Sequence, residues 1–477
     1  MERISVFRQE VKRELRLAEK VHVRNEIMKS KGNSKATWNI LNRCMSRGTA
    51  KRPYTSENHK TIADKFNRYF TSVGELTALK AKQIAKDQGL HKERTGLSEE
   101  VIVTQPTETE RFEFLNVEEK DVETVIKGLP NNKAPGFDKI SARVLKDSIP
   151  ATVSVITNLI NKSFAIDTFP KAWKVTEVVP VPKDGDLEQP ANNRPISLLP
   201  MLSKVNERLA HKQFVEFLTT NNKLSMHQSG NRKQHSTETA LIQVTDELLK
   251  AIDEKSVSLL VLLDMSKAFD SLNHELLLDK LFRLGLKPSA ISWFNSYLSD
   301  RYQRVRYEDS VSEFLELKHG VPQGSILGPV LFTVYINDLI NVIRHSQVSA
   351  YVDDCQLYFK FPVSDSQSAI TAVNNDLINI SKWCASSSLL INPDKTKLVV
   401  IGLPQLTKKL PAVSLSLLDK TISPVPVAKD LGVFIDQGLT YNVHISKTAS
   451  GCMNQLVQIN RIKHLLDNKT LLLLINS

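Results

Sequence analysis

Hydrophobic and polar residues alternate along the first fifty residues with the spacing of a helix. Apolar side chains recur at intervals of three or four positions, which places them on one face and predicts an amphipathic helical segment over residues 1–50. A turn-rich stretch from Gly48 to Glu57 then predicts a linker. The apolar face is formed by Phe7, Val11, Leu15, Leu17 and Val21.

The pattern becomes that of a compact α/β core from about Val117. Before it, a helix is predicted over Thr61–Val73, and residues 85–110 are polar and irregular. After it, the sequence predicts a short helix near residues 117–129, a turn at NNKAPGFD, a β-rich run in WKVTEVVPVP and long helices. The expected helices are Ala151–Phe164, Met201–Leu218 and Thr237–Ala251.

One strand is expected to carry an acid at its carboxyl end. Val257–Leu263 is a short, continuous apolar run, which favours a buried strand over a helix, and Asp264 follows it directly. A carboxylate in that place is costly unless it is solvated, paired or bound to a metal ion. Asp270, a few residues later, is expected to cap or precede the next helix and to have a structural role.

A second pair of acids lies at a predicted β-hairpin. Two alternating runs in SQVSAYVDDCQLYFKF meet at Asp353 and Asp354. Acids are common at turns, so the pair alone indicates little. If the hairpin shares a sheet with the strand before Asp264, the three carboxylates converge. Such a cluster would suit two Mg²⁺ ions roughly 3.5–4 Å apart and phosphoryl-transfer chemistry.

Charge is concentrated near the N-terminus. The formal net charge is +11, and residues 1–60 hold 15 Lys and Arg against 6 Glu. This excess predicts an arm that contacts a phosphate backbone, although a solvated helix would explain it equally well.

Other classes of protein are disfavoured by what the sequence lacks. The cysteines (Cys44, Cys355, Cys384 and Cys452) are too widely separated to suggest a zinc site or a disulfide framework. The N-terminus lacks the apolar stretch of a signal peptide, and apolar runs such as Leu259–Leu263 are too short to span a membrane. We expect a soluble, intracellular protein.

Three sequence motifs resemble those of a known family. YVDD in the hairpin, DMSKAFD after the strand and HGVPQGSILGPVLF between them are similar, in order and spacing, to the palm motifs of reverse transcriptases. SKAFD and PQGSILGPVLF resemble the LINE-type, jockey-like branch of non-LTR retrotransposons. With flanking segments such as RPISLLP and KDLGVFID, the resemblance covers about residues 125–460.

The resemblance implies roles for individual residues. Asp264, Asp353 and Asp354 would be the catalytic acids and metal ligands, with the Met265 carbonyl as a further ligand for Mg²⁺, for which Mn²⁺ could substitute. Phe269 would be the gate that excludes a ribonucleotide's 2′-hydroxyl. The remaining nucleotide-binding residues would be Lys183, Arg194, Gln323 and Gly324, and Lys395, with Lys397 close by, would protonate the leaving pyrophosphate.

The resemblance also implies a right-hand polymerase that copies an RNA template onto a DNA primer with deoxynucleoside triphosphates. The expected parts are a basic helical extension (1–115), fingers and palm (116–435, with the core at about 163–435) and the start of a thumb (436–477). Related elements carry an endonuclease before the polymerase, which is not expected here. The thumb is expected to be truncated, which would leave the apolar stretch Leu471–Ile475 without partners.

Two positions depart from the family pattern, and two other functions stay open. Asn231 stands where an aromatic residue is expected, and SSSLLIN lacks the Asn usual before its leucine pair. An inactive retroelement fragment that only binds nucleic acid is one alternative function. An RNA-templated RNA polymerase is the other, and Phe269 argues against it. The nucleus or the cytoplasm is the expected compartment.

Overall fold

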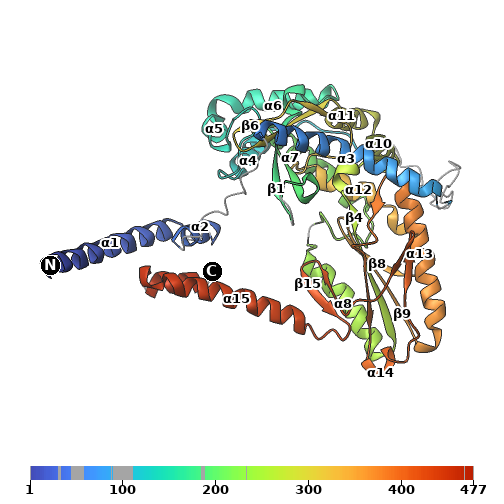
Figure 1. Cartoon of the computed structure of the whole chain (residues 1–477). Coiled ribbons are helices and arrows are strands. Elements are labelled where there is room, and N and C mark those ends of the chain that lie inside the picture. Colours follow the sequence, from blue (N-terminus) through green and yellow to red (C-terminus); the bar gives the residue numbers. More distant parts are fainter. Residues whose placement is uncertain are drawn as a thin grey trace. The chain divides into compact units, whose positions relative to one another are not determined.

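The computed structural model describes residues 2–30, 34–44, 58–87, 89, 111–183, 188–232, 234–466 and 468–475. It divides the chain into two compact units, one formed by Met1–Ser56 with Thr440–Ser477 and the other by Glu57–Leu439 (Figure 1). The boundaries predicted from the sequence, near residues 115 and 435, concern the functional parts of a polymerase and stay a prediction. The predicted linker at residues 48–57 and most of the polar segment 85–110 lie outside the described residues.

The smaller unit is built from helices at the two ends of the chain. They are α1 (Glu2–Lys29), α2 (Ser34–Cys44), α15 (Asn442–Ile462) and α16 (Asn468–Ile475). The core includes Val23 and Ile27 of α1 and Leu474 of α16, and Leu471 packs against it. The expectation that the apolar stretch Leu471–Ile475 lacks partners was therefore wrong, because the N-terminal helices cover part of it.

Helix α1 does not bury the apolar face that its sequence predicts. The predicted residues (Phe7, Val11, Leu15, Leu17 and Val21) are all exposed. Among the side chains of α1 that the structure describes, Val23 and Ile27 in the carboxyl-terminal turns contribute to the core. The helical pattern was correct, but the position of the contact along the helix depends on where α2, α15 and α16 lie within the unit.

A four-stranded antiparallel sheet forms the centre of the larger unit (Figure 1). Its order is β11-β3-β9-β8, so the strand before Asp264 lies between two others. All seven residues of β3 are buried, as the apolar run predicted, and α8 and α13 pack against the sheet. The bounds are β3 (Val257–Leu263), β8 (Gln347–Tyr351), β9 (Asp354–Phe361), β11 (Lys397–Ile401), α8 (Thr237–Asp253) and α13 (Ser366–Ser386).

A second sheet contains a hairpin, and the predicted β-rich run forms its first strand, β1. Strands β1 and β2 pair antiparallel, β1 pairs parallel with β5, and β6 and β7 both pair with β5. Helix α3 packs against β5 and extends beyond the predicted Thr61–Val73, because Ala78, Ala81 and Ala85 continue its buried face. The bounds are α3 (His59–Asp87), β1 (Val175–Pro182), β2 (Asn193–Leu198), β5 (Arg301–Tyr307), β6 (Ser310–Val311) and β7 (Leu315–Leu317).

Further helices and short strands complete the larger unit, whose buried apolar side chains form a main cluster and a smaller one beside α3, β1 and β5. The helices are α4 (Glu119–Gly128), α5 (Ala142–Asp147), α6 (Ile149–Ala165), α7 (Met201–Thr220), α9 (Ala268–Ser271), α10 (His274–Arg283), α11 (Pro288–Leu298), α12 (Gly328–Ile336) and α14 (Pro404–Thr407). The strands are β4 (Met265–Ser266), β10 (Leu390–Ile391), β12 (Leu415–Leu417), β13 (Lys420–Ile422), β14 (Val427–Asp430) and β15 (Val433–Asp436). This mixed architecture confirms the predicted α/β class. None of the helices within the described residues is long and apolar enough to cross a membrane.

Helix α13 ends in a Schellman motif with an unusual residue. The amide of Leu389 donates to the Cys384 carbonyl (2.9 Å), and the Ser388 amide donates to the Ala385 carbonyl (3.4 Å). Ser388 has a φ of 54°, a conformation in which helices usually place glycine. The backbone of Ser388 is therefore held in a left-handed conformation, which costs about 1 kcal/mol for a residue with a side chain.

Substituting Ser388→Gly is expected to raise the free energy of unfolding by about 0.5–1 kcal/mol, because glycine adopts positive φ without that cost. Urea unfolding followed by circular dichroism measures the change. The matched variant Ser387→Gly, where φ is −93°, should be slightly destabilising instead. Equal effects of the two substitutions would contradict the assignment.

Candidate active site

The register of the central sheet brings the three predicted acids together. Leu263, the last residue of β3, pairs with Cys355 of β9. Asp264 therefore follows β3 beside the start of β9, where Asp354 lies. Tyr351 pairs with Asp354, so Val352 and Asp353 form a two-residue turn between β8 and β9. The hairpin and the shared sheet are both as predicted.

The three carboxyls are close enough to influence one another's protonation. Burial raises the pKa of Asp353, and the charge of Asp264 raises it further. Burial also raises the pKa of Asp354, to about 6, with contributions from Asp353, Asp430 and Asp264. Like charges held together in a partly buried place disfavour full ionisation, so this cluster favours the binding of cations.

Two basic residues of the β1–β2 hairpin lie within electrostatic reach of the acids. The Lys183 amide donates to the Asn192 carbonyl (2.8 Å), which closes the hairpin beside Arg194. Both side chains lower the pKa of Asp353, against the larger effect of burial. Lys183 and Arg194 are thus brought toward the acids, although they lie far from them in the sequence.

Lys395 and Lys397 are separated by the structure. The pKa of Asp264 is raised by burial, and the charge of Lys395 acts against this. Lys397 instead donates to the Asp394 carbonyl (3.0 Å) and belongs to β11. Of the two lysines considered, Lys395 is therefore the one whose charge acts on the acid cluster.

The segment after Asp264 is held to strand β10. The Asp264 carbonyl accepts a hydrogen bond from the Asn392 amide (2.9 Å), and Met265 pairs with Ile391. In an antiparallel ladder, successive residues direct their carbonyls to opposite edges. The Met265 carbonyl therefore faces away from β10, toward the side on which β9 begins. This geometry leaves it available as an oxygen ligand.

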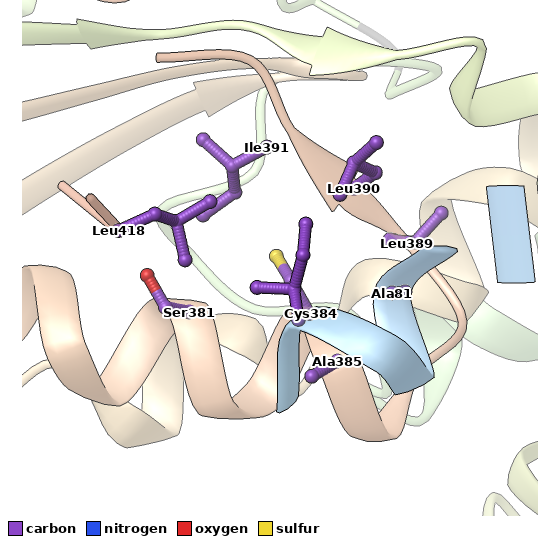
Figure 2. Close-up of a pocket in the computed structure, with 9 residues that line it drawn as sticks. Ala81, Ser381, Cys384, Ala385, Leu389, Leu390, Ile391 and Leu418 are labelled. Atoms are coloured by element: carbon purple, nitrogen blue, oxygen red, sulfur yellow. The ribbon is translucent and has the colours of Figure 1, made fainter. Parts of the chain in front are cut away.

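An apolar pocket lies behind β10 (Figure 2). Leu389, Leu390 and Ile391 approach it from one side, and Ser381, Cys384 and Ala385 of α13 from the other, with Ala81 of α3. None of the predicted site residues lines it. The pocket belongs to the packing that supports β10, which pairs with β4 in a separate two-stranded sheet, and none of the acids lines it.

Phe269 and the PQG segment are linked through Asp270. The Phe269 ring stacks on Phe332, with centroids 4.6 Å apart, and is only partly buried. Gln323 Nε2 donates to the Asp270 carboxylate (2.8 Å). Asp270 does not cap the next helix, because the side chain of Asn273 caps α10. The sequence thus missed the contact that fixes Gln323.

Gly324 lies where a side chain would not fit. Its φ is 119°, and a Cβ there would come within 2.9 Å of the Ser197 carbonyl oxygen. The Gln323 carbonyl accepts from the Ser197 amide (2.8 Å). The PQG turn therefore lies directly against β2, the strand that carries Arg194, and it depends on glycine for this close approach.

The residues present suit divalent cations in their donor chemistry. Carboxylate and carbonyl oxygens are the ligands that Mg²⁺ prefers, and the mutual repulsion of the acids would be relieved by bound cations. In the part of the chain that the structure describes, no three His, Cys, Asp or Glu side chains are already arranged to hold an ion. The match is therefore one of ligand type and proximity.

Comparison with known proteins identifies the family. The family model for reverse transcriptase (RNA-dependent DNA polymerase) matches residues 181–434, more than half of the chain. The chain belongs to the reverse transcriptase family. The matched residues include all three acids, Arg194 and the PQG segment, and the resemblance inferred from the sequence motifs is confirmed. Reverse transcriptases generally use divalent metal ions, in agreement with the ligand chemistry of this site.

Relatives of this chain come from mobile elements. It is 31% identical over 350 residues to a probable RNA-directed DNA polymerase from transposon BS of Drosophila melanogaster, covering 71% of this chain and 38% of the relative. It is 29% identical over 336 residues to the RNA-directed DNA polymerase from mobile element jockey of the same species, covering 69% and 36%. The chain therefore spans less than two-fifths of the length of these relatives.

The two departures from the family pattern both lie at left-handed backbone positions. Asn231 has a φ of 58°, and its side chain donates to the Thr333 hydroxyl (2.9 Å). Ser388, the residue before the leucine pair, has a φ of 54°. Asparagine tolerates positive φ better than most residues. The backbone conformation is therefore compatible with asparagine at position 231, and asparagine would also suit the position of Ser388.

Asp430 is a fourth acid that sequence reasoning missed. It is almost fully buried on β14 and accepts two hydrogen bonds from Gln356 Nε2, at 2.8 and 2.9 Å. Its charge contributes to the raised pKa of Asp354. Asp430 lies in the KDLGVFID segment that resembles the family, but the sequence does not reveal its contact with Gln356, because that contact depends on the distant strand β9.

Substituting Asp430→Asn is expected to flatten the pH dependence of stability. Burial raises the pKa of folded Asp430 from 3.8 to about 6. The associated stabilisation is fully present below the unfolded pKa and is lost as the pH rises through about 6. For one such group the loss amounts to about 1 kcal/mol between about pH 5 and about pH 7.5. Urea unfolding in EDTA at both pH values measures it, and identical pH dependence in variant and wild type would contradict the assignment.

Proposed function

We propose that this chain is an RNA-directed DNA polymerase, which adds deoxynucleotides to the 3′-hydroxyl of a primer on an RNA template. The observation that supports this most directly is the pairing of Leu263 with Cys355. That register gathers Asp264, Asp353 and Asp354 at one end of the central sheet. Membership of the reverse transcriptase family gives this cluster its chemical interpretation.

The acids are proposed to hold a pair of Mg²⁺ ions, for which Mn²⁺ can substitute. The ligands would be the carboxylates of Asp264, Asp353 and Asp354, with the Met265 carbonyl. When bound, such ions lower the pKa of the attacking hydroxyl and stabilise charge on the leaving oxygen. The protein's contribution is to hold its carboxylates in one place despite their repulsion.

The basic residues around the acids are proposed to bind the nucleotide. Lys183 and Arg194 offer a point charge and a planar, bidentate group, which suit a triphosphate. Both already lower the pKa of Asp353, so a phosphate between them and the acids would lie within reach of both. Lys395, whose charge acts on Asp264, is proposed to donate a proton to the leaving pyrophosphate.

The template and the sugar of the nucleotide are assigned to the segments around Asp270. Gln323 and Gly324 are proposed to lie beside the template and the incoming nucleotide, where glycine allows close approach of the backbone. Phe269 is proposed to lie under the sugar. An RNA template and a DNA primer are the proposed partners, and the proposed compartment is the nucleus or the cytoplasm.

The double substitution Asp353→Asn with Asp354→Asn, at the turn and at the start of β9, is expected to abolish incorporation of deoxynucleotides on a primed RNA template with Mg²⁺. Loss of several kcal/mol of metal-assisted stabilisation corresponds to a decrease of roughly a thousand-fold or more. Primer extension with purified protein measures this. Asp279→Asn, which removes an exposed acid paired with Arg283 on α10, is the matched control and should leave the rate unchanged.

The alternative function has its own outcome in the same assay. If neither wild type nor variant extends the primer while both retain the template RNA, the chain is a catalytically inactive retroelement fragment that only binds nucleic acid. Binding measured over a salt series reports the number of phosphate contacts. Activity that persists in the double variant would show that other residues carry the chemistry.

Replacing Phe269→Ala is expected to admit ribonucleotides. Removing the ring opens space for a 2′-hydroxyl, and the preference for deoxynucleotides, as the ratio of kcat/KM values, should fall about 10–100-fold. Phe269→Tyr keeps the ring and is expected to retain the preference. Competition between dNTP and rNTP in primer extension measures it, and an unchanged ratio in Phe269→Ala would refute the gate.

A further inference from the structure

The turn that carries Asp353 has an unfavourable backbone. Val352, the first of its two central residues, has a φ of 58°. Turns of this kind place glycine at that position, and a β-branched residue there is a conformational outlier. The left-handed conformation is sterically disfavoured for any residue that has a Cβ. Something outside the hairpin must therefore hold Val352 in place.

The Gln228 side chain makes hydrogen bonds to both backbone groups of Val352. Its Oε1 accepts from the Val352 amide (2.9 Å), and its Nε2 lies 3.4 Å from the Val352 carbonyl, to which it donates. The same Oε1 also accepts from the Gly230 amide (2.8 Å). Gln228 is only 1% exposed. Its amide is thus committed to the turn and to its own segment.

The segment around Gln228 is fitted closely to the hairpin. The Ala350 amide donates to the His227 carbonyl (2.9 Å), and the Ser229 amide donates to the Ala350 carbonyl (2.8 Å). A Cβ on Gly230 would come within 2.5 Å of Val352 Cγ2, so glycine is required for this approach. The backbone bonds align the segment with β8, which places the Gln228 amide opposite the turn.

We propose that Gln228 is a positioning residue for catalysis, which holds Val352 in its left-handed conformation and thereby fixes the direction of Asp353. The expected effect of Gln228 on kcat rests on the proposed polymerase function. The expected effect of Gln228 on the conformation of the turn does not. Gln228 is too deeply buried to meet a substrate, so its effect on the reaction passes through the turn.

The kinetic test compares two glutamines that bind backbone groups in the same way. Gln228→Met keeps the length of the side chain and removes its hydrogen bonds. Loss of the two hydrogen bonds to Val352, at about 1 kcal/mol each, should lower kcat about 30-fold. The KM for the nucleotide should change less than about three-fold. Gln213→Met is the matched control, because Gln213 binds both backbone groups of Leu115 (2.8 and 3.0 Å). It should leave kcat unchanged.

A rescue experiment separates positioning from general damage to the fold. Glycine adopts positive φ freely, so in a Val352→Gly background the turn needs less support from Gln228. Adding Gln228→Met to that background should lower kcat less than about five-fold. If Gln228→Met lowered kcat by the same factor in the wild-type and Val352→Gly backgrounds, the two residues would be uncoupled and the proposal would be overturned.

Hydrogen exchange supplies a readout that does not require activity. In the folded protein, peptides spanning residues 348–356 should exchange their amides at least about ten-fold faster in Gln228→Met than in wild type or Gln213→Met. If the wild type proves inactive, the proposed function fails, and faster exchange would still support the role of Gln228 in the turn. Unchanged exchange would overturn that role, whatever the activity.

Discussion

The repulsion among carboxylates at one end of the central sheet is the constraint on which the site depends. Three acids can approach one another only because strands β3, β8 and β9 are fixed in register by their backbone hydrogen bonds and by a fully buried β3. Burial and mutual charge together raise the pKa of Asp353 and Asp354. Stability of the fold is thus used to hold an arrangement that is electrostatically unfavourable without cations.

Positive charge reaches the acids from two separate parts of the chain, and a third part, the PQG turn, connects the surrounding elements. The β1–β2 hairpin provides Lys183 and Arg194, and the loop after β10 provides Lys395. The PQG turn contacts β2 through Ser197 and the segment after β3 through Asp270. A movement of any one of these elements would therefore alter the field at the acids as well as the shape of the site.

Local patterns were sufficient to predict the parts of the fold that depend on local sequence. The apolar run Val257–Leu263 and the hairpin around Asp353 could be recognised because burial and alternation act over a few residues. Asp430 and Gln228 could not, since each acquires its role from a strand that lies far away in the chain. The amphipathic pattern of α1 likewise predicted a helix without showing that Phe7 and Leu15 stay exposed.

Several segments around the acids contain backbone of positive φ, and at Lys267 and Val352 the residue that adopts it carries a side chain. Lys267, Val352, Gly320 and Gly324 all have positive φ, and they lie in the segments after β3, at the hairpin turn and beside PQG. Such conformations persist only where neighbouring contacts determine them strongly. A flexible cluster of acids would relax apart under its own repulsion. The strained turn at Val352 therefore helps the sheet to present Asp353 in a fixed place despite this repulsion.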